Sequence, residues 1–240
     1  MFGLFKKKPF ISPLTVDVHS HLISGIDDGV KTWHESIEII KQLSAIGIKK
    51  VITTPHIIAD YYPNTPEIIR NGVKQLNEKL KEQNILIEVV AGAEYYVDET
   101  FIQQINDNNE LLSFSDGYIL VETAFMNKPL QLEEVFFKLI AKGLKPIFAH
   151  PERYDYVQRD PDSLQKYIDM GVKLQINAAS LTGHYSLGAK KTAEYIINKQ
   201  WVHLIGSDIH RMQHVELYIK ATQLKSFQKA GQLSLLNNSL

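Results

Sequence analysis

Apolar positions along the chain follow two alternating spacings. Short runs rich in β-branched and aliphatic residues are typical of buried strands, and between them apolar residues recur every three or four positions, as on one face of a helix. Ile37, Ile40, Leu43 and Ile46 form one such helical series. The strand-like runs cover residues 16–19, 50–54, 87–93, 118–121, 146–149, 172–176 and 202–206. The sequence therefore predicts seven strands with helical segments between them.

Residues typical of helix ends flank several of the helical segments. Thr32 followed by Glu35 fits a capping box, and Thr65 followed by Pro66 fits an N-cap with proline at the first helical position. Glycines also follow helical segments and precede strands, where a left-handed C-cap is usual. These glycines are Gly47, Gly143 and Gly171.

The alternation of strand and helix predicts βα units and a parallel sheet. Closed on itself, such a sheet is a TIM-like barrel with one unit fewer; left open, it is a doubly wound sheet. No glycine-rich phosphate loop follows the first strand, which disfavours a nucleotide-binding fold. A length of 240 residues suits one hydrophobic core. We expect one α/β domain over residues 16–240, behind an N-terminal tail of residues 1–15.

The composition excludes several classes of chemistry. There is no cysteine, so disulfide scaffolds, thiolate metal sites and cysteine nucleophiles are ruled out. The formal net charge of −1 gives no electrostatic reason to expect nucleic acid. The first residues place apolar side chains before lysines, the reverse of a secretory signal, and their apolar run is too short to span a bilayer. We expect a cytoplasmic protein whose first residues form a frayed tail, with contact to an anionic membrane surface as the alternative.

The nine histidines are distributed unevenly, and a pair follows the first predicted strand. His19 and His21 lie in Asp-Val-His-Ser-His, and the alternation of an extended chain puts both on one side. Two imidazoles on one face make half of a metal site. They also lie at the carboxyl end of a strand, the edge where α/β barrels and open α/β sheets both build their sites.

Five of the other six predicted strands are also followed at their carboxyl ends by a histidine or an acidic residue. Six of the seven strand ends thus carry a nitrogen or oxygen metal ligand, so a chance origin would have to be invoked six times. Asp208 and His210 repeat the spacing of the first pair, and Asp27 or Asp28 is able to turn a carboxylate inward from the first loop. The candidate ligands are His19, His21, Asp28, His56, Glu94, Glu122, His150, Asp208 and His210.

Imidazole and carboxylate ligands together bind zinc, manganese or iron. Nine candidate ligands exceed the needs of one ion, which indicates two or three ions. Ions about 3.5–4 Å apart are the usual apparatus for cleaving phosphate esters, because they stabilise both the attacking and the leaving oxygen. The sequence therefore predicts a metal-dependent phosphoesterase.

Arg153 follows the fifth strand end closely, in His-Pro-Glu-Arg-Tyr. Its guanidinium is suited to bind phosphate oxygens in a bidentate manner; the alternative is a salt bridge to Glu152 or Asp155. The remaining histidines are interpreted as ordinary surface or packing residues, with contact to a substrate as the alternative for His184 and His214. These remaining histidines are His34, His184, His203 and His214.

The order and spacing of the motifs carry a family resemblance. The blocks DVHSHLISGIDDG, TTPH, GAEYY, ILVE, AHPERY and SDIH span nearly the whole chain. Together they resemble the bacterial manganese-dependent tyrosine phosphatases of the polymerase-and-histidinol-phosphatase (PHP) superfamily, the group associated with capsule and exopolysaccharide operons. The resemblance implies a distorted (β/α)7 barrel, in agreement with the strand count.

The resemblance also implies a site with three ions. His19, His21 and Asp208 would hold the first ion. Glu94 would bridge from it to a second ion, held by Glu122 and His150. The third ion would be held by Asp28, His56 and His210. Mn²⁺ is the expected metal, with iron or zinc as alternatives. Water activated by the ions would attack phosphotyrosine, Arg153 would bind the phosphate, and Asp208 or a water would protonate the leaving group.

Two positions depart from the family pattern. Ile57 replaces a basic residue or second histidine that many relatives have after the position of His56, and the loop after the last motif is shortened. Arg211 is the substitute for the arginine of that loop and is expected to bind substrate. An aromatic slot for the substrate ring, or packing against the barrel edge, is expected of Tyr61, Tyr62, Tyr95 and Tyr96.

Three functions are compatible with these residues. The first is a protein-tyrosine phosphatase that acts on a bacterial tyrosine kinase controlling capsular polysaccharide synthesis. The second keeps the metal site but takes a small phosphomonoester such as histidinol phosphate, as superfamily relatives do. The third is a barrel that binds phosphotyrosine without turnover, which nothing in the ligand set favours.

Overall fold

The computed structural model describes residues 11–240, whose strands pair in parallel in two sheets. The first sheet has the order β1-β2-β4 and the second the order β3-β5-β6-β7-β8-β9. The strands are β1 (Val16–Asp17), β2 (Lys50–Thr53), β3 (His56–Ile57), β4 (Glu88–Ala91), β5 (Glu94–Tyr96), β6 (Tyr118–Glu122), β7 (Lys145–Ala149), β8 (Lys173–Asn177) and β9 (Leu204–Gly206).

The two sheets form one ring of seven strands. Only two residues separate β2 from β3, and two separate β4 from β5, and the backbone pairing continues across these breaks through Glu94 N–H, which donates to Pro55 O at 3.1 Å. At the other edge the N–H of Asp208 donates to His19 O at 2.8 Å, and Ser20 pairs with Ile209. The fold is a distorted (β/α)7 barrel, as the sequence predicts.

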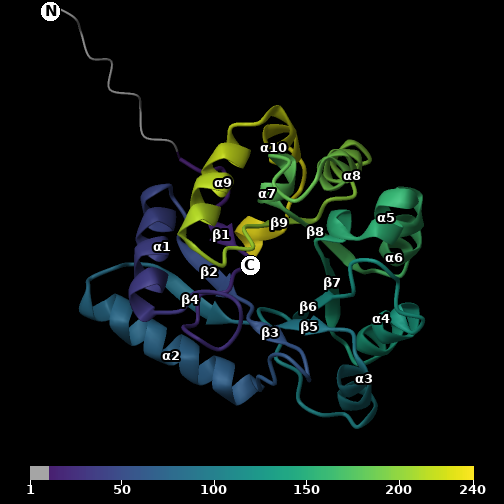
Figure 1. Ribbon diagram of the computed structural model, residues 1–240, viewed down its shortest axis with the longest axis horizontal. Helices are drawn as coiled ribbons and strands as arrows, with labels where there is room; N and C mark the ends of the chain where they lie inside the picture. Colours follow the sequence, from purple (N-terminus) through teal and green to yellow (C-terminus); the bar gives the residue numbers. More distant parts are fainter. Residues whose placement is uncertain (1–10) are drawn as a thin grey trace, which may run out of the picture.

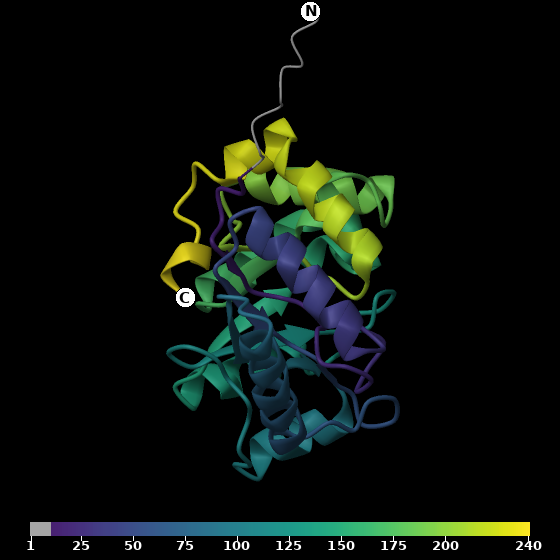
Figure 2. The same ribbon diagram turned by 90° about the vertical axis from the view of Figure 1, so that its left-hand side faces the viewer.

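Helices surround the ring of strands (Figure 1). The last barrel helix, α9, lies beside the first, α1, which lies beside α2 (Figure 2), so the outer layer closes as the strands do. The helices are α1 (Trp33–Ala45), α2 (Pro66–Glu82), α3 (Glu99–Asn106), α4 (Leu132–Ala141), α5 (Asp155–Arg159), α6 (Gln165–Asp169), α7 (Ala178–Leu181), α8 (Leu187–Asn198), α9 (Met212–Thr222) and α10 (Lys225–Ala230), with the 3₁₀ turns η1 (Pro151–Arg153), η2 (Pro161–Leu164) and η3 (Asn237–Ser239).

The predicted helix ends are confirmed with one difference. Thr32 Oγ1 accepts a hydrogen bond from Glu35 N–H at 3.2 Å, but the Glu35 carboxylate accepts from Lys31 N–H and not from Thr32, so half of the capping box forms. Thr65 caps α2, which begins at Pro66. Left-handed φ angles of +97°, +79° and +98° occur at Gly47, Gly143 and Gly171.

Apolar side chains divide between the inside of the ring and the layer under the helices. Alternation along each strand separates them: on β7, Ile147 and Ala149 belong to the inner cluster and Phe148 to the outer one. On β6, Leu120 points inward, and Glu122, two residues on, ends the strand. The packed interior therefore holds the strand ends in fixed positions around one rim.

The segment expected to be a tail is only partly described. Residues 1–10, with their lysines and phenylalanines, lie outside the described residues. Ser12 N–H donates to Ile46 O at 2.7 Å, and Leu14 is buried, so the packed part of the chain begins before Val16. None of the helices within residues 11–240 has the length and apolar character needed to cross a bilayer.

Candidate metal centre

All nine predicted ligands lie together at the carboxyl-terminal rim of the barrel. Most are buried, since His19, His21 and Glu94 have no exposed surface, whereas Asp28 is exposed at the mouth. They lie at the first residues of β3 and β5, at the last residue of β6, directly after β7, and in the segments that follow β1 and β9. Their nitrogen and oxygen atoms form four overlapping groups within 4.8 Å.

The deepest group surrounds His19. Its Nε2 atom lies 3.1 Å from Glu94 Oε2, 3.3 Å from Asp208 Oδ1 and 3.2 Å from His21 Nε2. His21 Nε2 is in turn 3.4 Å from the same Glu94 oxygen. Two imidazoles and two carboxylates thus point their donor atoms at one small volume.

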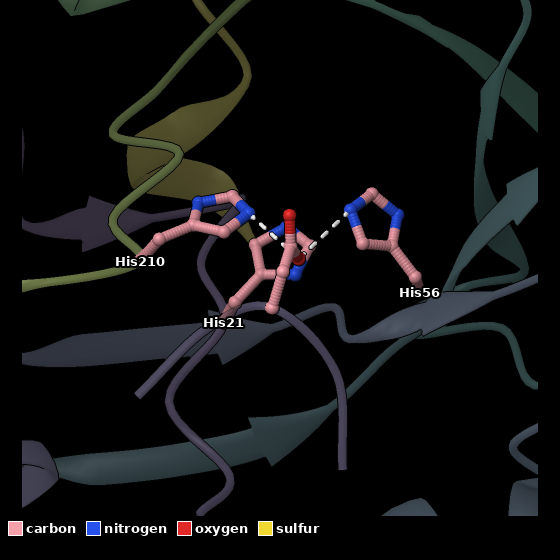
Figure 3. Close-up of side chains that lie close together, drawn as sticks. His21, His56 and His210 are labelled. Carbon is pink, nitrogen blue, oxygen red and sulfur yellow. Dashed lines mark ion pairs between the residues drawn. The ribbon is translucent and has the colours of Figure 1, made fainter. Parts of the chain in front are cut away.

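The outer group surrounds Asp28. Its Oδ1 atom lies 3.5 Å from His56 Nε2 and 3.3 Å from His210 Nε2. The His56 and His210 rings stand on opposite sides of His21 (Figure 3), and the centroids of the His21 and His210 rings are 3.9 Å apart. His21 therefore belongs to both the deep and the outer group.

The side-chain groups of the structure cross the division among ions that the resemblance implies, and that division stays a prediction. Glu122 Oε1 lies 2.9 Å from His56 Nδ1 but Glu122 Oε2 is 3.9 Å from His150 Nε2, so Glu122 groups with His56 and Glu94. His150 groups with His19 and Asp208, although its Nε2 is also 2.9 Å from Glu94 Oε1. Shared members connect all four groups.

Hydrogen bonds at Nδ1 orient two of the imidazoles. His21 Nδ1 is 2.7 Å from Asp27 Oδ2 and His210 Nδ1 is 3.0 Å from Asp208 O. Both oxygens only accept, so each Nδ1 carries a hydrogen, and Nε2 is the atom that the neutral ring would offer to a metal ion. The two loop aspartates therefore differ in role: Asp27 orients His21, and Asp28 faces the cluster.

Two cluster residues have a left-handed backbone. His150 has a φ of +32° and Asp208 a φ of +53°, and a side chain in this region of φ costs on the order of 1–3 kcal/mol. Histidine and aspartate are among the non-glycine residues that adopt it more readily. His150 follows β7 directly and Asp208 lies two residues after β9, so the chain changes direction at the rim at both positions.

The charges in the cluster are strongly coupled. Burial alone would raise the pKa of Glu94, but the imidazoles of His19 and His56 hold it well below its usual range. Burial would likewise lower the pKa of His56, but Glu122 and Glu94 raise it to about 9. Protons on the imidazoles thus balance the negative charge of several buried carboxylates. Divalent cations are able to supply the same positive charge in place of these protons. The donor set and its orientation fit bound divalent cations.

A cavity of about 370 Å³ opens onto the cluster, and Arg153 lines it. The guanidinium lies between the Phe125 and Tyr185 rings, 4.7 Å and 4.1 Å from their centroids. Its Nη1 donates to Asp208 Oδ2 at 3.1 Å. Neither Glu152 nor Asp155 is its ion-pair partner within the described chain, so the predicted alternative of a salt bridge to those residues is wrong.

Comparison with known proteins gives the family. Residues 15–234 match the family model described as "Capsular polysaccharide synthesis, CpsB/CapC". The chain belongs to the CpsB/CapC family. Tyrosine-protein phosphatase YwqE of Bacillus subtilis is 31% identical over 199 residues, covering 82% of this chain and 78% of its own. Tyrosine-protein phosphatase CpsB of Streptococcus pneumoniae is 26% identical, with 85% and 86% covered.

A solved structure supports the same family. It belongs to a description that covers two proteins, YwqE from Bacillus subtilis and CpsB from Streptococcus pneumoniae, and calls them unique metal-dependent tyrosine phosphatases. The match has a TM-score of 0.80 at 27% identity and covers 93% of this chain and 94% of that one. The likeness therefore extends over nearly the whole barrel.

Aromatic residues around the cavity of this CpsB/CapC protein only partly follow the prediction. Tyr62 and Tyr96 line the cavity. Tyr61 points into solvent, with 78% of its surface exposed, and the buried Tyr95 uses its hydroxyl to accept from Leu112 N–H. Two of the four tyrosines predicted for the aromatic slot, Tyr62 and Tyr96, therefore line the cavity.

Other predicted positions are also placed by the structure. Arg211, His184 and His214 line the cavity mouth, whereas His34 is exposed on α1. Ile57 packs in the core. The sequence reasoning did not identify the residues that support the cluster from β8 and the neighbouring loops, namely Gln175, Asn177, Phe125 and Tyr185. The sequence contained one indication of the β8 residues, because the sixth predicted strand is the only one without a candidate ligand at its end.

Proposed function

We propose that this CpsB/CapC protein is a metal-dependent protein-tyrosine phosphatase. The observation that carries the proposal is the convergence of nine nitrogen and oxygen ligands and one arginine on a single cavity. Relatives over most of the chain are named tyrosine-protein phosphatases, which supports the same activity. Because the chain has no cysteine, a thiolate nucleophile is excluded.

The proposed cofactor is Mn²⁺, two or three ions, with iron or zinc as alternatives of similar ligand preference. When bound, the ions supply Lewis acidity and lower the pKa of the attacking water. His19, His21, Glu94, His150 and Asp208 would hold the deep side, since their donor atoms are buried. The outer side belongs to Asp28, His56, Glu122 and His210.

Arg153 is proposed to bind the phosphoryl group. Among residues 11–240 its hydrogen-bond partner is Asp208, so the other guanidinium donors remain available to non-bridging phosphate oxygens. Stacking between Phe125 and Tyr185 fixes the plane of the guanidinium before substrate arrives. A fixed fork of donors stabilises the charge that develops during phosphoryl transfer.

Asp208 is proposed as a metal ligand and as the anchor of Arg153. Burial would raise its pKa, but His19, His210 and Arg153 hold it well below the usual range. An ionised carboxylate accepts hydrogen bonds and does not donate a proton, so this environment does not favour Asp208 as the acid. Phenolate is a fairly good leaving group, so phosphotyrosine needs no strong acid.

The surface beside the cavity favours a polypeptide substrate. A groove of about 680 Å³ along α9 shares His184, Arg211 and His214 with the cavity and continues to Lys220. Chain flanking a phosphotyrosine would lie there, with Arg211 in contact with it. The proposed partner is the tail of a bacterial tyrosine kinase that controls capsular polysaccharide synthesis, met in the cytoplasm.

The activity is tested with purified protein loaded with Mn²⁺. We expect hydrolysis of p-nitrophenyl phosphate and of phosphotyrosine peptides, loss of activity with a chelator, and recovery when Mn²⁺ is restored. His150→Ala should reduce the rate strongly because it removes one ligand, whereas His34→Ala, at an exposed position on α1, should leave it unchanged. Full activity in chelator and in His150→Ala would disprove the mechanism.

Hydrolysis of a small phosphomonoester such as histidinol phosphate is the alternative. The two substrates are separated by comparing kcat/KM for a kinase-tail phosphopeptide and for histidinol phosphate. A Lys220→Glu variant should lower kcat/KM for the peptide and leave the small substrate unaffected, because Lys220 lines the groove and not the cavity. A higher kcat/KM for histidinol phosphate in the wild type would favour the alternative.

A further inference from the structure

The strand β8 has no predicted metal ligand at its end and instead carries two buried carboxamides. Gln175 and Asn177 have no exposed surface, and both lie beside the metal cluster. His19 Nδ1 is 2.9 Å from Gln175 Oε1, and Gln175 Nε2 donates to Asn177 Oδ1 at 2.8 Å. Asn177 Nδ2 then donates to Asp208 Oδ2 at 2.6 Å. A continuous chain of hydrogen bonds therefore joins two ligands of the cluster.

The chain has one direction, set at its Asp208 end. Asp208 Oδ2 accepts a hydrogen bond from Arg153 Nη1 at 3.1 Å, and a guanidinium only donates, so this oxygen also acts as an acceptor toward Asn177. Asn177 must therefore present its NH₂ group to Asp208 and its oxygen to Gln175. Gln175 must in turn present its NH₂ group to Asn177 and its oxygen to His19. It follows that His19 Nδ1 carries a hydrogen, so Nε2 is the atom that the neutral ring would offer to a metal ion.

We propose that Gln175 and Asn177 are positioning residues that set the tautomer of His19 and the orientation of Asp208 for metal binding. The inference rests on the metal centre of the proposed function. It completes a pattern, because His21 and His210 also bind an acceptor through Nδ1. Groups of this kind, behind the ligands, typically affect metal affinity by about 10–100-fold.

The surroundings of the chain restrict its freedom. Asn177 N–H donates to Glu152 Oε1 at 2.8 Å, which fixes the backbone from which the side chain extends. A Cβ atom at Gly206 would lie 2.7 Å from both Gln175 Nε2 and His19 Cβ, so glycine there provides the space in which they meet. Tyr185 Oη, 3.3 Å from Asp208 Oδ2, closes the other side.

A buried amide elsewhere in the barrel provides the control. Asn237 is as buried as Asn177, but its side chain bonds only to backbone groups of Val16 and Ile205 within residues 11–240. Replacing it should lower the free energy of unfolding without changing metal affinity. This control separates the loss of stability expected on replacing any buried amide from a specific loss of metal affinity.

The experiment measures Mn²⁺ dissociation constants by calorimetry for wild type, Gln175→Met, Asn177→Leu, the double variant and Asn237→Leu. We expect each single variant on β8 to bind Mn²⁺ about 10–100-fold more weakly. The double variant should bind no more weakly than the weaker single variant, because either change breaks the same chain. Unchanged affinity in the singles, or losses that multiply in the double, would overturn the inference.

A second measurement needs no variant that must fold. In wild-type protein loaded with Zn²⁺, ¹⁵N NMR of the histidine rings should show His19 with hydrogen on Nδ1, and hydrogen on Nε2 would refute the inference. Failure of the wild type to bind any Mn²⁺ would overturn the metal centre itself. Normal wild-type binding with unaffected variants overturns only the positioning role.

Discussion

Arg153 shows how neighbours prepare one side chain for its ligand. A lysine at this position would keep the positive charge but would lose both the planar stacking and the fork of donors. Phe125 and Tyr185 would still attract an ammonium, but only a planar guanidinium is able to stack on both ring faces. This position therefore requires the planar guanidinium of arginine and not only a positive charge.

We predict that Arg153→Lys lowers kcat/KM for p-nitrophenyl phosphate by about 10–100-fold, the loss expected for one or two charge-assisted hydrogen bonds worth about 1.5–3 kcal/mol. Metal content should not change, because Arg153 is not in the ligand groups. Steady-state kinetics and metal analysis check both statements. Arg159→Lys, at an exposed position, is the matched control and should behave as wild type. A wild-type kcat/KM in Arg153→Lys would exclude the phosphate role.

The sequence is informative about the ligands and much less so about what supports them. Histidine and carboxylate at strand ends are recognisable by type and position, so the nine residues that converge here were all identifiable. Gln175 and Asn177 are neutral residues whose role depends on where each carboxamide points. Phe125 is one aromatic residue among many, and its place over Arg153 depends on loop geometry. Such details arise from packing and not from any periodic pattern.

At the level of elements, the seven predicted strands are all present, but two are interrupted. The second breaks at Pro55, which has no N–H for the ladder, and the third breaks near Gly92, where a Cβ atom would lie 2.8 Å from Phe114. Each break moves the strand end into the second sheet. Thus His56 on β3 and Glu94 on β5 become neighbours in register. Propensity alone does not predict such a break.

The pairing of β8 with β9 includes a titratable residue at the end away from the cluster. His203 Nδ1 accepts from Leu174 N–H at 3.1 Å. Burial, with a smaller contribution from Lys173, lowers the pKa of His203 from 6.5 to about 4. Between these pH values the unfolded chain binds a proton that the folded protein does not. The free energy of unfolding should therefore fall as pH decreases from about 6.5 to about 4.

We predict that His203→Asn removes part of this acid sensitivity, because asparagine keeps an acceptor for Leu174 N–H and gains no proton. Urea unfolding at pH 7.5 and pH 5, in chelator so that metal does not contribute, should show a smaller loss of stability in the variant. The difference should be about 1 kcal/mol, after allowance for solvent screening of the partly exposed ring. Equal losses in the two proteins would contradict the assignment.

At the scale of the whole molecule, the candidate ligands come from six of the seven strand positions around the ring. Ions held there would connect segments far apart in sequence, including β1 and β9, whose seam closes the barrel. They would also neutralise carboxylates that protonated imidazoles otherwise balance. Metal binding and barrel stability should therefore be coupled.

We predict that Mn²⁺ raises the melting temperature of the wild-type protein relative to chelated protein. At an ion concentration about 100 times Kd the gain is about 2.7 kcal/mol, which for a domain of this size corresponds to roughly 5–10 °C. Differential scanning calorimetry in chelator and in Mn²⁺ measures it. His150→Ala should show a smaller gain, since it removes a ligand, and His34→Ala should show the full gain. If ions left the melting temperature of the wild type unchanged, the cluster would not hold them in the folded state.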